Sequence, residues 1–342
     1  MNGYQVRGNF IDRIYNTVIP FVANAAQVFQ LSTTAIVAEL QFRLTGTLTN
    51  AGFSAAPTKR VESLENLISL LNITGNGKVT GAQSAPFCSV DAAYLAYKTR
   101  CMEATAPYRV DVGTTNAAYP FVSTFKKYFG AKRSGSSSFY QSCFADARNM
   151  STFTASVQWR DVTAVIDPTT GTGGTSTLSA VQIAVLSREY QGGPPTTGAP
   201  YVMESQRSFN IANSGLLTPF LNAPVNNWMP RQTFKSMVGD VNYADPSDAL
   251  IATTQRPEGA HIQTQQNGNY LWMDTTYLSQ RDVDKTLYKL ETLPTGYVTL
   301  EYPGGLNLAT AATLQNNIDV TYTGGNTNTL QITDEQVVFA KK

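Results

Sequence analysis

Apolar and polar side chains alternate along residues 33–49, TTAIVAELQFRLTGTLT. One parity carries the apolar side chains Ile36, Ala38, Leu40, Phe42, Leu44 and Leu48. The other parity is mostly polar, with Glu39, Gln41 and Arg43 near its centre. Because successive side chains of a strand point to opposite faces, this pattern predicts a strand with one buried face. The segment is long for a strand, so we predict a wall of a sandwich or barrel.

The same alternation returns at residues 151–160 and, less cleanly, at 178–187. Between these segments, residues 167–176 are rich in threonine and glycine, which is typical of a flexible connection without a core of its own. At 342 residues the chain has the length of about two domains. We therefore predict a first β domain over residues 32–167, a linker at 168–177 and a second β domain over 178–342.

Residues 9–31 show a different pattern. Apolar side chains recur there at helical spacing, at Phe10, Ile14, Val18 and Phe21. This spacing predicts an N-terminal amphipathic arm, residues 1–31, outside the first β domain. The arm either packs on that domain as a helix or faces a membrane or a partner, and the pattern leaves both open.

Each half also contains one segment with helical periodicity. In the first half this segment spans residues 89–102, with Ser89 as the candidate N-cap. In the second half it spans residues 279–291, and its apolar positions are Val283, Leu287 and Leu290. Short strands surround both segments, separated by long loops rich in glycine, proline and asparagine. Loops of this length favour jelly-roll or Greek-key connections over a hairpin meander, so we predict an all-β protein.

Charged residues make up only 14 % of the chain, against about 25 % in typical globular proteins. Threonine, serine and asparagine take their place. Such a surface suits a protein covered by neighbouring copies, and it equally suits a plain threonine-rich β protein. The net charge is +1, and within residues 1–31 the basic residues are only Arg7 and Arg13. Because nucleic-acid binding depends largely on basic residues that neutralise phosphates, direct nucleic-acid binding is not expected.

The cysteines and the chain start bear on the compartment. Cys88, Cys101 and Cys143 are an odd set, too small for a disulfide framework, and we expect reduced thiols in a protein made in a cytosol. The first 13 residues contain no apolar core or cleavage site of a secretory signal. No run of about 18 apolar residues is present that would span a bilayer as a helix.

No group of residues predicts catalysis. The single histidine, His261, lies in a segment rich in glycine, glutamine and asparagine, without a recognisable nucleophile for a triad. Residues 171–177 are glycine-rich but lack the lysine of a phosphate-binding loop. Asp240, Asp245 and Asp248 carry oxygen ligands suited to calcium, but their spacing matches no calcium loop. We expect no catalytic residues, no cofactor and no bound metal.

Several features follow one another in a particular order. They are the arm, the strand at 36–48, residues 65–68 before a strand that ends in a tight turn at 75–77, residues 146–160, residues 295–300, residues 304–306 and a terminal hairpin at 317–333. This order resembles that of the double jelly-roll major capsid proteins of tailless icosahedral viruses, particularly bacteriophages with an internal membrane. The resemblance rests on order and length and covers essentially the whole chain.

The resemblance implies two consecutive jelly rolls, each an eight-stranded antiparallel β-sandwich or barrel with a short helix. It also implies a virion protein, synthesised in the host cytoplasm, of which three copies form a pseudo-hexagonal capsomer. This homotrimer would contact neighbouring capsomers, a vertex (penton) protein, and the internal membrane or membrane-associated virion proteins. We predict that Phe10, Ile14, Val18 and Phe21 face inward and contact that layer or the base of a neighbouring capsomer.

Two alternatives stay open. A β-sandwich protein that binds or cleaves glycans would use aromatic residues such as Trp228, Tyr243 and Trp272 as sugar platforms. Carboxylate pairs that cleave glycosides are recognised by their separation in space, which sequence does not show. A minor vertex protein of the same kind of virion is the second alternative. Vertex proteins of this family usually have one jelly roll, whereas this chain predicts two.

Overall fold

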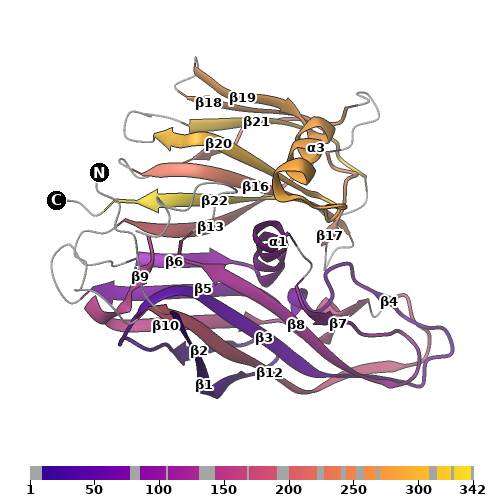
Figure 1. The fold of residues 1–342 in the computed structure, drawn as a ribbon. Helices are drawn as coiled ribbons and strands as arrows, with labels where there is room; N and C mark the ends of the chain where they lie inside the picture. Colours follow the sequence, from indigo (N-terminus) through magenta and orange to yellow (C-terminus); the bar gives the residue numbers. More distant parts are fainter. Residues whose placement is uncertain are drawn as a thin grey trace. The chain divides into compact units, whose positions relative to one another are not determined.

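A computed structural model describes most of the chain. The described residues are 10–77, 85–104, 107–130, 143–167, 169–190, 200–221, 227–239, 244–251, 258–266, 270–307, 314–324 and 327–339. The chain divides into two compact units, a first unit of Met1–Val202 with Ala340–Lys342 and a second unit of Met203–Phe339. Within the described residues, each unit combines antiparallel strands with one α-helix (Figure 1).

Eight of the described strands form the two main sheets of the first unit. They are β1 (Phe10–Pro20), β2 (Ala26–Gln30), β3 (Ile36–Ala51), β5 (Ile68–Gly77), β6 (Ala85–Val90), β8 (Ala118–Tyr128), β10 (Met150–Trp159) and β12 (Thr175–Tyr190). They form two sheets, each named here after its first strand. The β1 sheet has the spatial order β1-β12-β3-β8, and the β2 sheet has the order β2-β10-β5-β6. Counted along the chain, these orders are one, eight, three, six and two, seven, four, five. This is the strand order of a jelly roll, which confirms the predicted fold for the first half.

Shorter elements decorate this frame. They are β4 (Thr58–Lys59), β7 (Arg109–Val110), β9 (Ala145–Asp146), β11 (Ile166–Asp167) and 3-10 helices at Glu65–Leu67, Ala147–Asn149 and Val162–Ala164. Helix α1 (Ala92–Glu103) lies between the fifth and sixth strands. Asp91 caps it by accepting the Tyr94 N–H at 2.7 Å, so the helix begins two residues later than a Ser89 cap would place it.

The alternation of residues 33–49 is confirmed in β3. The apolar parity is buried from Leu40 to Leu48, whereas Arg43 on the other parity is exposed. Phe42 stacks on Phe125 of β8, with ring centroids 5.6 Å apart. Burying side chains of this size contributes about 1.5–3 kcal/mol each, so such rows hold the sheets of the first unit together.

The second unit repeats the plan. Its strands are β13 (Tyr201–Asn210), β14 (Gly215–Leu217), β15 (Phe220–Leu221), β16 (Trp228–Gly239), β17 (Ala244–Pro246), β18 (His261–Gln266), β19 (Tyr270–Thr276), β20 (Tyr297–Asn307), β21 (Leu314–Val320) and β22 (Thr327–Val338). A β13 sheet has the order β13-β22-β16-β20, and a β19 sheet has the order β14-β21-β18-β19. β15 continues β14 beside β21, and β17 adds a short strand to β16. With β14 and β15 taken as one interrupted strand, the jelly-roll order returns, and α3 (Tyr277–Tyr288) again lies between strands five and six.

The boundary between the units differs from the predicted one. β12 pairs with β3 along its length and also with β1, so it is the eighth strand of the first unit. We had predicted that this segment opens the second domain at residue 178. The described part of the predicted linker 168–177 belongs to the first unit, where Ala55 and Thr172 form a β-bridge. Alternation identifies a strand but not the sheet it joins, which is why the prediction was wrong.

Two predicted turns are also wrong. Residues 75–77 extend β5 opposite β10, and a Cβ on Gly75 would lie 2.5 Å from the Met150 sulfur, so this glycine allows close packing. The predicted terminal hairpin is not a hairpin, because β21 and β22 join different sheets. His261, expected in a loop, is the first residue of β18.

Candidate assembly surfaces

Residues Phe10–Pro20 form β1, the first strand of the jelly roll. The prediction of an N-terminal arm outside the first domain is therefore wrong. β1 pairs with β12 from Phe10 opposite Tyr190 to Pro20 opposite Gln182, with a register shift between Ile14 and Val18. The helical interpretation failed because a spacing of four residues is even. Residues four apart therefore share a face of a strand as well as a face of a helix.

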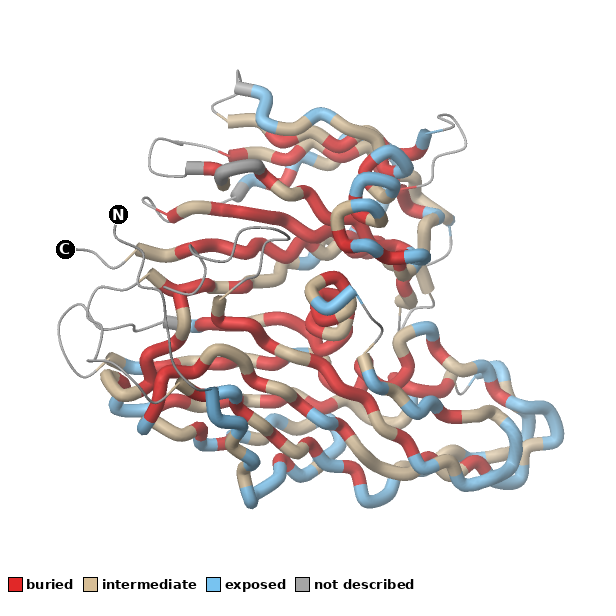
Figure 2. Tube along the Cα trace, viewed as in Figure 1, coloured by how far each residue is buried: buried red, intermediate tan, exposed pale blue. Residues whose placement is uncertain are grey.

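Three of the four predicted contact residues share an exposed face of β1. Phe10, Ile14 and Val18 are 42, 70 and 37 % exposed, and exposed residues predominate along this strand (Figure 2). Phe21 follows the strand at odd spacing and packs edge-to-face against the buried Trp159 of β10, with centroids 5.2 Å apart. Phe21 thus contributes to the packing of its own unit, and whether the other three face the inside of a shell stays a prediction.

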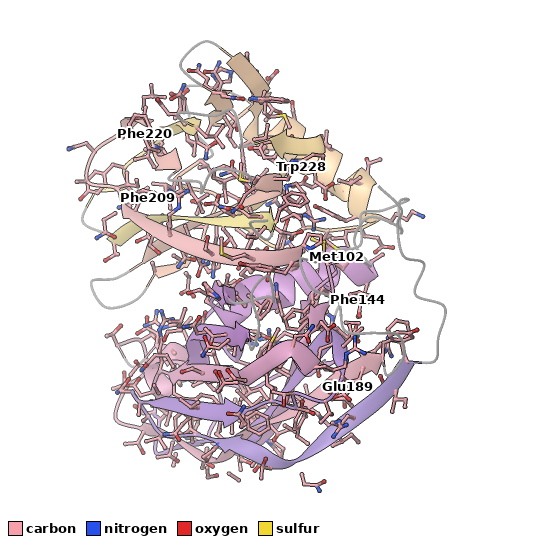
Figure 3. All side chains as sticks on the ribbon, turned by 90° about the vertical axis from the view of Figure 1, so that its left-hand side faces the viewer. Met102, Phe144, Glu189, Phe209, Phe220 and Trp228 are labelled. Carbon is pink, nitrogen blue, oxygen red and sulfur yellow. The ribbon has the colours of Figure 1, made fainter. Side chains whose placement is uncertain are left out.

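The other side of β1 is anchored to the first unit by polar contacts. Arg13 Nε lies 2.9 Å from Oε1 of Glu189, whose side chain is fully buried. Glu189 belongs to β12 and is labelled in Figure 3. The Ser187 hydroxyl donates to the same carboxylate at 2.8 Å. The Tyr15 hydroxyl accepts the Ser32 N–H at 2.9 Å. These contacts fix β1 as part of the sheet although it lies at the edge.

A row of alternating charges crosses the outer face of the β1 sheet. Arg188 donates to Asp12 at 3.0 Å and lies 3.6 Å from Glu39, and its hydrogen bond lowers the pKa of Asp12. Lys126 Nζ lies 3.5 Å from Glu39 and 2.6 Å from Glu103 of α1. Each exposed pair contributes at most about 1 kcal/mol. The main consequence of the row is that these charges are matched within the chain, beside the exposed apolar residues of β1.

Helix α3 buries polar residues together with aromatic ones. Gln280 and Asp284 are buried beside Tyr277 and Tyr288. Of the predicted apolar positions Val283 is exposed, whereas Leu290, just after the helix, is buried. The Asp284 carboxylate accepts the Thr299 N–H of β20 at 2.7 Å, and Gln280 donates to the Thr299 carbonyl at 2.9 Å. Arg281 donates to the Tyr297 carbonyl at 3.0 Å. The polar face of α3 therefore satisfies backbone groups on the edge of β20 where the next strand of a sheet would lie.

Burial has an electrostatic consequence at this contact. It raises the pKa of Asp284 to about 7, although the hydrogen bonds from Thr299 and Gln280 act in the opposite direction. The carboxyl group of Asp284 therefore titrates near neutral pH. Sequence periodicity did not reveal this residue, because Asp284 resembles any solvated helix position.

Helix α1 covers an edge in the first unit in a related way. The Thr99 hydroxyl accepts the Lys126 N–H of β8 at 2.9 Å and donates to the Leu95 carbonyl at 2.7 Å. Further along β8, the Thr124 N–H bonds to the Tyr108 carbonyl at 3.1 Å, and β7 pairs with β8. In both units the helix between strands five and six thus shields the edge of the sixth strand.

The aromatic residues considered as sugar platforms are not brought together. Trp272 of β19 is exposed and donates to the Gln266 side chain at 2.7 Å. Trp228 belongs to β16, in the other sheet, where it packs edge-to-face on Phe339 at 5.9 Å (Figure 3). Tyr243 lies outside the described residues. Of the three aromatic residues considered for glycan binding, Trp272 is therefore the one that the structure describes as exposed, and it shares no platform with Trp228.

His261 is hydrogen-bonded to Asp274 across β18 and β19, and no described hydroxyl or thiol bonds to it. The Asp248 carboxylate accepts the Gly296 N–H at 2.7 Å, while Asp240 lies outside the described residues. No described group of three His, Cys, Asp or Glu side chains could hold a metal ion.

Cys88, Cys101 and Cys143 are all buried. None of the described helices has the length and apolarity to cross a membrane.

Comparison with known proteins places this fold. No family model and no curated protein matches the chain. The major capsid protein of Sulfolobus turreted icosahedral virus matches with a TM-score of 0.71 over 97 % of each chain, at 12 % identity. The major capsid protein of bacteriophage PM2 matches with a TM-score of 0.60 over 98 % of this chain and 99 % of its own, at 11 % identity. The capsid of the virus PBCV-1 matches with a TM-score of 0.57 over 99 and 97 %, at 10 % identity. The chain has the double jelly-roll fold of these viral capsid proteins.

Proposed function

We propose that this protein is the major capsid protein of a tailless icosahedral virus and is a component of the virion shell. The observation that carries the proposal is the complete jelly-roll strand order in both units, matched over nearly the whole chain by viral capsid proteins. Fold alone does not imply function. The neutralised charge row and the exposed apolar face of β1 add support, because both suit a surface that is covered on assembly.

The proposed building block is a homotrimer. Three copies of a chain with two jelly rolls supply six similar units, enough for a pseudo-hexagonal capsomer. A closed ring of identical chains is also the usual symmetry of a soluble oligomer. Neighbouring capsomers and a vertex (penton) protein complete the shell in this proposal.

The proposed inner contact uses Phe10, Ile14 and Val18 on the exposed face of β1. Apolar surface removed from water contributes about 25 cal/mol per Å². Each chain therefore gains only a modest amount, and many copies in one shell together provide firm attachment. The layer beneath is proposed to be an internal membrane or membrane-associated virion proteins.

Light scattering during size-exclusion chromatography tests the building block. The expected mass is about three times the 37.1 kDa of one chain. Electron microscopy and lipid analysis of purified particles test the shell and the membrane. A protein that stays monomeric at all concentrations and forms no shells would contradict the proposal. Copy number in the virion separates a major capsid protein from a minor vertex protein, which would be present only at the vertices.

A further inference from the structure

The edges of the sheets differ in how they are protected. Within the described residues, the edge strands β2, β7, β14, β15 and β17 have five residues or fewer, and short edge strands pair poorly with other chains. The longer strands β8 and β20 are shielded by α1 and α3, as described above. β1, with 11 residues, and β19, with 7, remain long and have no described partner on their second edge (Figure 1).

Natural edges are kept from pairing by lysine, interior proline, unmatched charges or β-bulges. Of these devices, each strand has only a register shift against its inner neighbour, between Ile14 and Val18 in β1 and between Leu271 and Met273 in β19. β1 has no lysine and its proline, Pro20, is its last residue, while β19 has neither residue type. The charges of β1 are already matched, Asp12 by Arg188 and Arg13 by Glu189, and Asp274 of β19 is hydrogen-bonded to His261. A new neighbour would therefore leave none of these three side chains without its present partner.

We propose that β1 of one copy and β19 of another copy pair edge to edge, so that the β1 sheet of one chain continues into the β19 sheet of the next. This inference rests on the proposed function, since it names the contact that builds the trimer. Main-chain hydrogen bonds would supply the affinity, as in other cases of strand addition. The seven residues of β19 span about 24 Å, which fits within the length of β1.

The side chains fit this pairing. β1 presents Ile14 and Val18, and β19 presents the exposed Leu271 and Trp272. Pairs of aromatic and β-branched residues across neighbouring strands contribute about 0.2–1 kcal/mol each. Because β1 and β19 are different surfaces, the contact is head-to-tail. Such contacts form a ring when the rotation between copies closes, as the proposed trimer requires, and an open filament when it does not. Pairing of β1 with a second β1 would instead give a two-fold dimer.

Cysteine cross-linking tests the proposal in the full-length chain. Asn16→Cys or Thr17→Cys in β1 is combined with Leu271→Cys or Thr275→Cys in β19, which covers neighbouring registers. Under mild oxidation, at least one combination is expected to yield disulfide-linked trimers on a non-reducing gel, whereas single variants yield none. Val28→Cys, on the short edge strand β2, combined with Thr275→Cys is the matched control and is expected not to cross-link. The three natural cysteines are buried and do not compete.

Failure of this inference and failure of the proposed function give different results. A trimer that cross-links in none of the combinations overturns the β1–β19 contact and leaves the proposed function standing. Dimers linked through a single β1 cysteine overturn it in favour of β1–β1 pairing. A chain that never forms trimers or shells overturns both.

Amide hydrogen exchange on the unmodified protein is the second measurement. Assembly is expected to slow exchange in β1 and β19, and unchanged exchange in either strand overturns the contact.

Discussion

Within the described residues, the strands β20 and β1 each have an outer edge that pairs with no further strand, but only the edge of β20 is covered by another element. Along β20, Gln280 and Asp284 of α3 bond to the Thr299 backbone. Along β1, no described residue takes that place, and the strand presents Phe10, Ile14 and Val18 to solvent. A covered edge ends a sheet, whereas an open edge offers it for extension. The polar inner face of α3 takes the place of a further strand beside β20, whereas the apolar surface of β1 stays exposed in the single chain and is the surface that we propose a partner covers.

The largest expected effect on stability is the pH dependence that comes from Asp284, at the contact between α3 and the edge of β20. The pKa of Asp284 is raised by burial from 3.8 to about 7. Between roughly pH 4 and 7 the folded state therefore holds a proton that the unfolded state has released. The free energy of unfolding should fall as pH rises through this window, by up to about 1.4 kcal/mol per pH unit from this group, and level off above it. Denaturant unfolding across that range measures the slope.

Two variants isolate the contribution of Asp284. Asp284→Asn removes the titrating proton, so its stability should depend less on pH than that of the unaltered protein. Asp282→Asn, at an exposed position of the same helix, should keep the slope. Identical slopes for Asp284→Asn and the unaltered protein would show that this carboxyl group does not titrate in the window.

The edge strand β1 is held to β12 by the ion pair between Arg13 and Glu189. Arg13→Met leaves the fully buried Glu189 carboxylate without its cation. Breaking a buried pair typically costs about 3–5 kcal/mol. Arg13 is partly exposed and partly screened, so we expect about 2 kcal/mol less stability in the first unit. Urea unfolding provides the measurement. Arg43→Met, on the exposed face of β3, should change stability by less than about 0.5 kcal/mol, and equal losses in both variants would refute the anchoring role.

In the first unit, the hydrogen bond between Thr99 of α1 and the edge of β8 can be tested by substitution. Thr99→Val keeps the shape of the side chain but leaves the Lys126 N–H of β8 without its acceptor. An unsatisfied buried donor costs about 1–3 kcal/mol, and we expect a loss near 1 kcal/mol. Thr286→Val is a matched control, because Thr286 makes the same bond to its own helix, at Asp282, but is exposed. Thermal unfolding that gives equal losses for the two variants would remove the edge-capping role of Thr99.

The exposed face of β1 should have the smallest effect on stability and a clear effect on assembly. Combined Phe10→Asp and Ile14→Asp substitutions should lower the free energy of unfolding by less than about 1 kcal/mol, because Ile14 is largely exposed and Phe10 loses only the contacts of its ring with Phe144 and Tyr190. Both jelly rolls should persist. The trimer should persist as well, because main-chain hydrogen bonds and not these side chains supply most of the proposed β1–β19 contact, while shell assembly or lipid retention weakens. Val28→Asp, at an exposed site on β2, is the control. Particles of normal yield that retain their lipid would show that this face makes no such contact.

Local patterns in the sequence determined much of the fold. The alternation that buries Leu40, Phe42 and Leu44 follows from the geometry of a strand and needs no knowledge of neighbours. The helix of each half was also predicted, to within a few residues, from its spacing and its position between strands. The number of jelly rolls followed from the chain length and from the resemblance to viral capsid proteins.

Only the tertiary structure decided which partners these elements have. The pattern of β12 fits either jelly roll, and its pairing with β1 and β3 assigned it to the first. The spacing of Phe10, Ile14 and Val18 fits a strand and a helix, and hydrogen bonding to β12 selected the strand. Helix α3 buries Asp284 because a β20 backbone donor lies opposite it, which no periodicity records. Local geometry is encoded in neighbouring residues, whereas sheet membership and edge protection depend on backbone groups far away in the chain.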